Sequence, residues 1–425
     1  MGDQARQENL FRLLGGLTDI SKHITSQAKG LSEIRSLSQK TDIQKLVRGY
    51  DLEHISVGVL GSHSAEEVGV AAKASGLPCV VICERGREDL YANHNRDLFE
   101  HIILVDRFAD MTNREVVNQL IKLNTIFIPN RSFSVYVGYD MIEEGFPVPL
   151  YGNRFLLRAE ERTELKNQYW LLERAGVKIP KHFESPDEID RLAIVKVQQK
   201  ARPLERAFFY ATSALEYAEK AEGLLRKGVI DEQGLRKARI EEYVIGQKFN
   251  ANFQGWALTD VFGDFDFVGF DDRKQTNLHG VLGLPAREQL SVDIAVRNEE
   301  IGHYGLTMRE SQKPLVYQAA VAFRCTCRKE IPPGVNGLFA LQGAIAYDAD
   351  DPESKRLAFY VFDVSPRIPG CPCVGPTSPE MRRLTLKHSR HLKKCGLDRI
   401  EAPMDLPMLE IKLAAETGRL PEIVT

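Results

Sequence analysis

Between residues 51 and 152, short apolar runs alternate with amphipathic stretches. Runs rich in β-branched residues predict strands, and apolar residues at every third or fourth position predict the helices between them. Strands that alternate with helices are typical of an open parallel α/β sheet. We expect strands at 57–60, 79–83, 102–105 and 125–128, with helices over 64–75 and 116–123.

The first 50 residues carry a different pattern. Apolar residues recur at steps of three and four, as at Leu10, Leu14 and Leu17. This spacing predicts two amphipathic helices. They form either an oligomerisation or docking arm, or a helical extension that packs on the domain that follows; the second is the more common use of such a pattern.

The pattern changes again after residue 152. A charged stretch predicts a helix over 156–175, ended by Gly176 and Pro180. Longer, partly alternating apolar runs follow, and these are typical of antiparallel strands. We expect strands at 193–197, 240–246, 249–258, 265–270, 338–347 and 357–364, and helices over 213–227, 380–394 and 408–417.

Length and composition narrow the classes of protein. A chain of 425 residues usually forms more than one domain. With 56 Lys and Arg against 59 Asp and Glu, the net charge is −3, which argues against a basic nucleic-acid binder or a membrane-surface protein. No secretion signal or apolar run of about 20 residues, the length that spans a membrane, is present. We expect a cytoplasmic protein with no nucleic-acid or membrane partner and with reduced cysteines.

One strand-to-helix junction has the composition of an anion site. The first predicted strand ends in Gly58-Val-Leu-Gly61-Ser62-His63-Ser64 and continues into a helix. Free backbone N–H groups and the helix dipole can hold a phosphate at such a place. The third glycine of the dinucleotide-binding motif is absent, so a nicotinamide cofactor is not expected.

A second set of polar residues is spread along the later strands. Lys196 lies on a strand, Glu241-Glu242-Tyr243-Val244 forms another, and Gln342 and Asp363 lie on two late strands. The lysine can neutralise phosphates. The backbone of the second strand can hydrogen-bond to an adenine edge, and one of its carboxylates can bind the ribose hydroxyls. Gln342 and Asp363 can hold Mg²⁺. Each residue alone has an ordinary structural interpretation, so the prediction rests on their order.

A series of short motifs extends from about residue 55 to residue 424. The motifs are Leu60-Gly-Ser-His-Ser64, Pro129 with Ser132-Phe133 and Gly138, Val148-Pro149 with Gly152-Asn-Arg154 and Arg158, Ile240-Glu-Glu-Tyr-Val244, Gly269 and Asp271 with Arg273 and Asn277, Arg309-Glu310-Ser311, Pro332-Pro-Gly334, and Val361-Phe-Asp-Val-Ser-Pro-Arg367. In this order they resemble the archaeal formate-dependent FAICAR synthetases (PurP), a family of ATP-grasp ligases.

The resemblance implies a fold and a reaction. After the helical extension over 1–50, which the resemblance does not cover, it implies a parallel α/β substrate-binding domain over 51–152 and an ATP-grasp domain over 153–425 with a lid lobe near 176–246. In the reaction, ATP and formate give formyl phosphate, which formylates the amine of the nucleotide AICAR to FAICAR in IMP biosynthesis. The cofactors are ATP and Mg²⁺, with Mn²⁺ as a substitute, and the resemblance suggests a closed homo-oligomer such as a hexamer.

The resemblance also assigns roles to individual residues. They fall into four groups, for substrate, reacting end, cofactor and metal. Substrate binding falls to Ser62, His63, Ser132 and Asn277, catalysis at the reacting end to Arg309, Glu310 and Arg367, ATP binding to Lys196, Arg206, Glu241, Glu242 and Val244, and metal binding to Gln342 and Asp363.

The chain departs from the family in its phosphate loop. Family members follow the strand lysine with a glycine-rich segment, whereas residues 197–207 hold no glycine, so the backbone cannot approach a triphosphate as closely. Lys200, Arg202 and Arg206 can partly substitute as point charges. Asp363 replaces a metal-binding Glu, Asn130-Arg131 replaces His-Gly, and Pro369-Gly-Cys-Pro-Cys373 replaces Asp-Gly-Gly-Thr-Asn. Two alternatives therefore stand beside the ligase: a divergent paralogue with another substrate, and an inactive nucleotide-binding or structural partner.

A basic run near the C-terminus has two interpretations. Arg382, Arg383, Lys387, Arg390, Lys393 and Lys394 lie there with His388 and His391. The run forms either an anion site or, more commonly for such a pattern, the solvated face of a helix.

Overall fold

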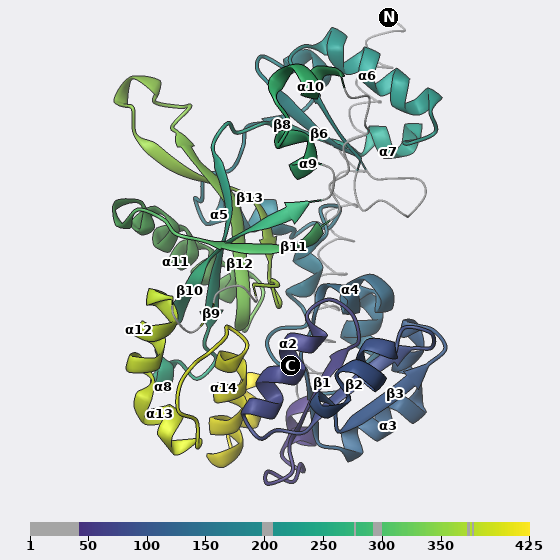
Figure 1. Ribbon diagram of the computed structural model, residues 1–425, viewed down its shortest axis with the longest axis vertical. Coiled ribbons are helices and arrows are strands. Elements are labelled where there is room, and N and C mark those ends of the chain that lie inside the picture. The colour runs from purple at the N-terminus through teal and green to yellow at the C-terminus, as the bar shows by residue number, and fades with distance from the viewer. Residues whose placement is uncertain (1–41, 198–206, 276–277, 292–299, 372–374, 376–377) are drawn as a thin grey trace, which may run out of the picture.

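The computed structural model describes residues 42–197, 207–275, 278–291, 300–371, 375 and 378–425. Three sheets organise these residues, as Figure 1 shows. In the described ranges, no helix is both long and apolar enough to cross a membrane.

The first sheet is parallel, as predicted, and its strand order is β3-β2-β1-β4. Strand β1 pairs with β2 on one side and with β4 on the other side. The loops that follow β1 and β4 therefore open together, at the point where parallel sheets commonly bind ligands. The elements are β1 (Ser56–Leu60), α2 (Ala65–Ala74), β2 (Cys79–Glu84), β3 (His101–Val105), α3 (Arg114–Lys122), β4 (Thr125–Phe127) and α4 (Arg131–Val137).

The second sheet is antiparallel, with the order β11-β10-β9-β12-β13. Aromatic side chains such as Phe253, Phe267 and Phe339 pack with Phe323 of a long helix, α11, to form its core. The elements are α5 (Gln168–Arg174), β9 (Gln247–Gly255), α8 (Thr259–Phe262), β10 (Phe265–Gln275), β11 (Glu300–Leu306), α11 (Lys313–Glu330), β12 (Gly337–Tyr347) and β13 (Leu357–Ser365).

The third sheet belongs to a smaller lobe, which lies at the top of Figure 1. Its strand order is β5-β8-β6-β7, and every pairing is antiparallel. We call this part the small lobe. Its elements are β5 (His182–Phe183), β6 (Ala193–Val197), β7 (Ala207–Ala211), α6 (Ala214–Arg226), α7 (Glu232–Arg236) and β8 (Arg239–Glu242), and α9 (Leu278–Leu282) and α10 (Ala286–Ser291) lie beside it.

The C-terminal helices return to the first sheet. Leu409 and Leu413 share one hydrophobic core with Val57 and Val59 of β1, and Val424 pairs with Tyr151 in an isolated bridge. Residues near both ends of the described chain therefore stabilise the parallel domain. The helices are α12 (Pro379–Lys387), α13 (Ser389–Lys394), α14 (Asp405–Glu416) and α15 (Leu420–Ile423).

Short turns of helix complete the described fold. They are the π turns η1 (Leu90–His94) and η4 (Met141–Gly145) and the 3₁₀ turns η2 (Arg96–Leu98), η3 (Phe108–Thr112), η5 (Leu157–Glu160), η6 (Pro186–Glu188), η7 (Glu310–Gln312) and η8 (Pro352–Ser354).

The predicted helix over 156–175 is wrong. The structure has η5, a stretch without helix, and α5, which begins only after Asn167. The Asn167 carboxamide oxygen accepts hydrogen bonds from the backbone N–H groups of Tyr169 and Trp170. A side chain that caps the first turn in this way starts a new helix, which is why the charged stretch does not continue as one.

Two other predictions differ from the structure. The strand expected over 240–246 ends at Glu242, and the following residues leave the sheet. The pattern also gave no sign of α11, although at 18 residues it is a long helix, because its buried positions are mostly small or polar.

The basic run turns partly inward. His388 Nε2 lies 2.7 Å from Asp266 Oδ2, and Lys387 Nζ donates to Asp266 Oδ1 at 2.7 Å. Asp266 is buried and also accepts a hydrogen bond from Trp256. These residues stabilise a buried carboxylate, while others such as Arg382 stay exposed.

Candidate functional site

A cavity of about 670 Å³ lies between the small lobe and the antiparallel sheet. It collects side chains from both parts of the chain. The predicted residues that line it are Lys196, Glu241, Glu242 and Val244 from the small lobe and Gln342 and Asp363 from β12 and β13. Six residues from four separate segments of the sequence thus meet at one cavity.

Lys196 and Glu241 form an ion pair in the wall of the cavity. The Tyr169 hydroxyl accepts a hydrogen bond from Lys196 Nζ and donates to Glu241 Oε2, both at 3.1 Å, and Arg239 Nε also donates to this carboxylate at 3.1 Å. Since Glu241 is buried among these partners, it orients the lysine rather than facing the cavity freely. Glu242 also lines the cavity, and its predicted contact with a ribose stays a prediction.

Gln342 and Asp363 are directly opposite each other in the pairing of β12 with β13. Gln342 Oε1 accepts a hydrogen bond from Arg273 Nη2 at 3.1 Å, and its Nε2 donates to Ser365 Oγ at 2.9 Å. Among the described residues no group of three or more His, Cys, Asp or Glu could hold a metal ion. One carboxylate with one amide oxygen still fits Mg²⁺, which keeps several waters and takes other ligands from substrate phosphates.

Arg162 also lines the cavity, and the sequence analysis missed it. Burial lowers the pKa of its guanidinium, but the charges of Asp363 and Glu241 and a hydrogen bond with Tyr169 outweigh this and raise the pKa above its usual value. Arg162 is therefore a permanent cation beside the two residues predicted to bind metal. Arg162 belongs to none of the family motifs, and its stretch was expected to be an ordinary charged helix, so nothing in the sequence singled it out.

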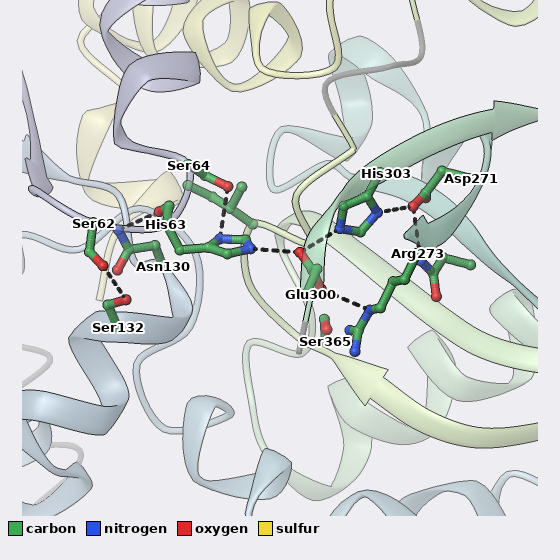
Figure 2. A network of polar contacts seen from close by, with 12 residues as sticks. Ser62, His63, Ser64, Asn130, Ser132, Asp271, Arg273, Glu300, His303 and Ser365 are labelled. Carbon is green, nitrogen blue, oxygen red and sulfur yellow. Dashed lines mark hydrogen bonds and ion pairs between the residues drawn. The ribbon is translucent and has the colours of Figure 1, made fainter. Parts of the chain in front are cut away.

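The Gly-Ser-His junction is held rigidly at the end of β1. Asn130 donates to the carbonyls of Leu60 and His63 at 2.9 and 2.8 Å, and its oxygen caps α4. The Ser132 hydroxyl donates to Ser62 Oγ at 2.9 Å (Figure 2). Asn130, which departs from the family, thus joins the two loops at the edge of the parallel sheet.

His63 faces a polar network that the sequence did not predict (Figure 2). Its Nδ1 lies 2.9 Å from Ser64 Oγ, and its Nε2 lies 3.8 Å from Glu300 Oε1 at the start of β11. Glu300 in turn contacts His303, which contacts Asp271. The sequence signals in this network were Asp271 and Arg273, which belong to a family motif; Arg273 Nε lies 3.2 Å from Glu300 Oε2.

The residues expected at the reacting end are not gathered at the cavity. Arg309 and Glu310 are exposed at the start of η7 and do not line it. Arg367 is buried and pairs with Glu160 through Nη2 at 2.7 Å. Asn277 and Arg206, together with Lys200 and Arg202, lie outside the described residues. The roles of these residues stay predictions.

The His303 contacts predict a dependence of stability on pH. Burial lowers the pKa of the imidazole, but hydrogen bonds to Asp271 and Glu300 outweigh this and raise the pKa to about 9 from 6.5. A folded-state pKa above the unfolded value gives stability that is complete below pH 6.5 and is lost as the pH rises through about 9. Urea unfolding of wild type and His303→Asn should therefore differ most near pH 6 and least near pH 10. Equal differences at both would refute the ion pairs.

The protein has the fold of an ATP-grasp ligase. A crystal structure described as an IMP biosynthesis protein PurP from Thermococcus kodakaraensis is similar over 87% of this chain and 100% of that chain, with a TM-score of 0.60 and 20% identity. Residues 57–183 match a family described as "Protein of unknown function (DUF1246)", and residues 216–425 match "Domain of unknown function (DUF1297)".

Two relatives cover most of the chain, and both are named 5-formaminoimidazole-4-carboxamide-1-(beta)-D-ribofuranosyl 5'-monophosphate synthetase. The protein of Methanothermobacter thermautotrophicus is 33% identical over 91% of this chain and 99% of its own length. That of Methanopyrus kandleri is 38% identical over 78% of this chain and 88% of its own. The chain belongs to this family, the FAICAR synthetases, and the resemblance predicted from its motifs is confirmed.

Proposed function

We propose that the protein is an ATP- and formate-dependent ligase that formylates AICAR to FAICAR in IMP biosynthesis. The observation that carries this proposal is the 33% identity to a synthetase of that name over nearly its whole length. The cavity supports it, because Lys196, Gln342 and Asp363 line it together, and such residues can neutralise phosphates and hold Mg²⁺. The printed name of the relatives supplies the substrate.

The chemistry has two steps. A formate oxygen attacks the γ-phosphorus of ATP, the bond to ADP breaks, and formyl phosphate forms. The AICAR amine then attacks the formyl carbon, phosphate leaves with the former formate oxygen, and the amine loses a proton. Formate becomes electrophilic only with phosphate as its leaving group, so the site must hold three anions together and exclude water.

The residues of the chain divide this work. Lys196, held by Glu241 and Tyr169, would neutralise the ATP phosphates. Gln342 and Asp363 would hold Mg²⁺, or Mn²⁺ in its place, and the ion would neutralise charge on the transferred phosphoryl group. Ser62, His63 and Ser132 bind the AICAR phosphate, and Asn277 binds the same substrate. Arg309, Glu310 and Arg367 act at the reacting end once the substrates bring them together.

The alternatives keep one specific observation in their favour. The segment 197–207 has no glycine, and this is what we would expect of a divergent paralogue or of an inactive nucleotide-binding partner. Arg162 offers a cation in the same cavity that can offset this loss.

We further propose that the protein works in the cytoplasm as a closed homo-oligomer such as a hexamer.

The test is ADP release by the purified protein with ATP and Mg²⁺. We expect release only when formate and AICAR are both present, with FAICAR formed in equal amount by chromatography. ADP release that is independent of AICAR would favour a paralogue with another acceptor. No ADP release, with ATP still bound by calorimetry, would favour the inactive partner.

A further inference from the structure

Glu300 brings a negative charge to the Gly-Ser-His junction. Its Oε1 lies 3.8 Å from His63 Nε2 and 2.7 Å from His303 Nε2, and its Oε2 lies 3.2 Å from Arg273 Nε. Figure 2 shows the carboxylate between His63 on one side and these two cations on the other. The contact joins the parallel domain to the edge strand of the antiparallel sheet.

The two cations behind Glu300 are themselves fixed. His303 contacts Asp271, which accepts hydrogen bonds from Asn250 at 2.9 Å and Asn252 at 2.5 Å. Arg273 is held by Gln342, because Arg273 Nη2 donates a hydrogen bond to Gln342 Oε1 at 3.1 Å. The position of the Glu300 carboxylate is therefore set by residues of four strands, β9, β10, β11 and β12, and not by its own side chain alone.

The carboxylate keeps its charge and stays accessible. Burial raises the pKa of Glu300, but hydrogen bonds with His303 and His63 and the charge of Arg273 outweigh this and hold the pKa well below its usual range. The His63 and Glu300 side chains are 34% and 28% exposed. A solute that reaches His63 thus meets a charged carboxylate at the same nitrogen.

We propose that Glu300 is a specificity-determining residue that competes with the 5'-phosphate of the nucleotide substrate for His63. This inference rests on the proposed function, in which His63 faces that phosphate. A phosphate dianion and a carboxylate at one imidazole nitrogen repel each other. His303 and Arg273 limit the repulsion, because they neutralise Glu300 and hold it back from His63.

The test compares two ligands by calorimetry: AICAR and its nucleoside, which lacks the phosphate. Glu300→Gln keeps the shape but removes the charge, so we expect AICAR to bind about tenfold more tightly, a small part of the repulsion between close charges at an effective dielectric constant of about 20. Binding of the nucleoside should not change. Glu53→Gln is the matched control, since Glu53 is exposed before β1, at the opposite end of the strand from His63.

A second variant should have the opposite effect. His303→Asn removes one cation that holds Glu300, so the carboxylate turns toward His63 and AICAR should bind about threefold more weakly, again without change for the nucleoside. The inference would be overturned if either variant changed the affinities for AICAR and for its nucleoside by nearly equal factors. It would also be overturned if Glu300→Gln bound AICAR more weakly than wild type. If wild type shows no turnover but the variants show these shifts in AICAR affinity, the result counts against the proposed function and not against this inference.

Discussion

Replacing Asp363 with asparagine should lower kcat about a thousandfold, which corresponds to about 4 kcal/mol of transition-state stabilisation. Asp363 lines the cavity opposite Gln342 and is the carboxylate of the proposed metal pair. Asparagine keeps the size and one oxygen but loses the charge that holds Mg²⁺ against the transferred phosphoryl group. Binding of ATP should weaken much less than kcat falls, because the charge matters most in the transition state.

The measurement is steady-state FAICAR formation at several Mg²⁺ concentrations. Asp363→Glu is the matched control, since the family carries glutamate at this position and the charge is kept; it should retain most of the activity. A kcat for Asp363→Asn within tenfold of wild type, at equal thermal stability, would remove Asp363 from the metal site.

Replacing Arg154 with methionine should lower the free energy of unfolding by about 6 kcal/mol, the sum of four charge-assisted hydrogen bonds at roughly 1.5 kcal/mol each. The Arg154 guanidinium is buried and donates to the carbonyls of Ile142, Phe146, Val148 and Thr425 at 2.6 to 2.9 Å. Burial lowers its pKa only to about 10, so it is charged at neutral pH. Methionine leaves four carbonyls without this donor.

Urea unfolding of both proteins checks this expectation. Arg236→Met is the control, because the Arg236 side chain is 81% exposed and pairs with Glu232 on its own helix; it should cost about 0.5 kcal/mol or less. A loss of less than 2 kcal/mol for Arg154→Met would mean that water or other donors satisfy these carbonyls.

The parallel sheet was predictable because each strand gives a local signal. All five residues of β1 are buried, so the strand is apolar on both faces and stands out from the helices beside it. The cavity was predictable for a different reason. Lys196, Gln342 and Asp363 lie on separate strands, and only their order, shared with a family, indicated that they meet.

The remaining site depends on contacts between distant parts of the chain. Glu300 is 237 positions from His63, yet its Oε1 lies 3.8 Å from His63 Nε2, and no periodicity links the two. Arg162 and His303 are single polar residues without a motif, so nothing in the sequence distinguishes them from surface residues. Such pairs arise only when the domains dock, and pattern analysis does not reach them.

The order of bond formation provides the most direct test of the account. The reaction can be run with AICAR, ATP, Mg²⁺ and formate that carries ¹⁸O in both oxygens, and the products examined by mass spectrometry. Formyl phosphate requires that one labelled oxygen leaves in the inorganic phosphate while the other stays in FAICAR. Phosphate without label, or no FAICAR at all, would contradict the proposal that this cavity activates formate with ATP.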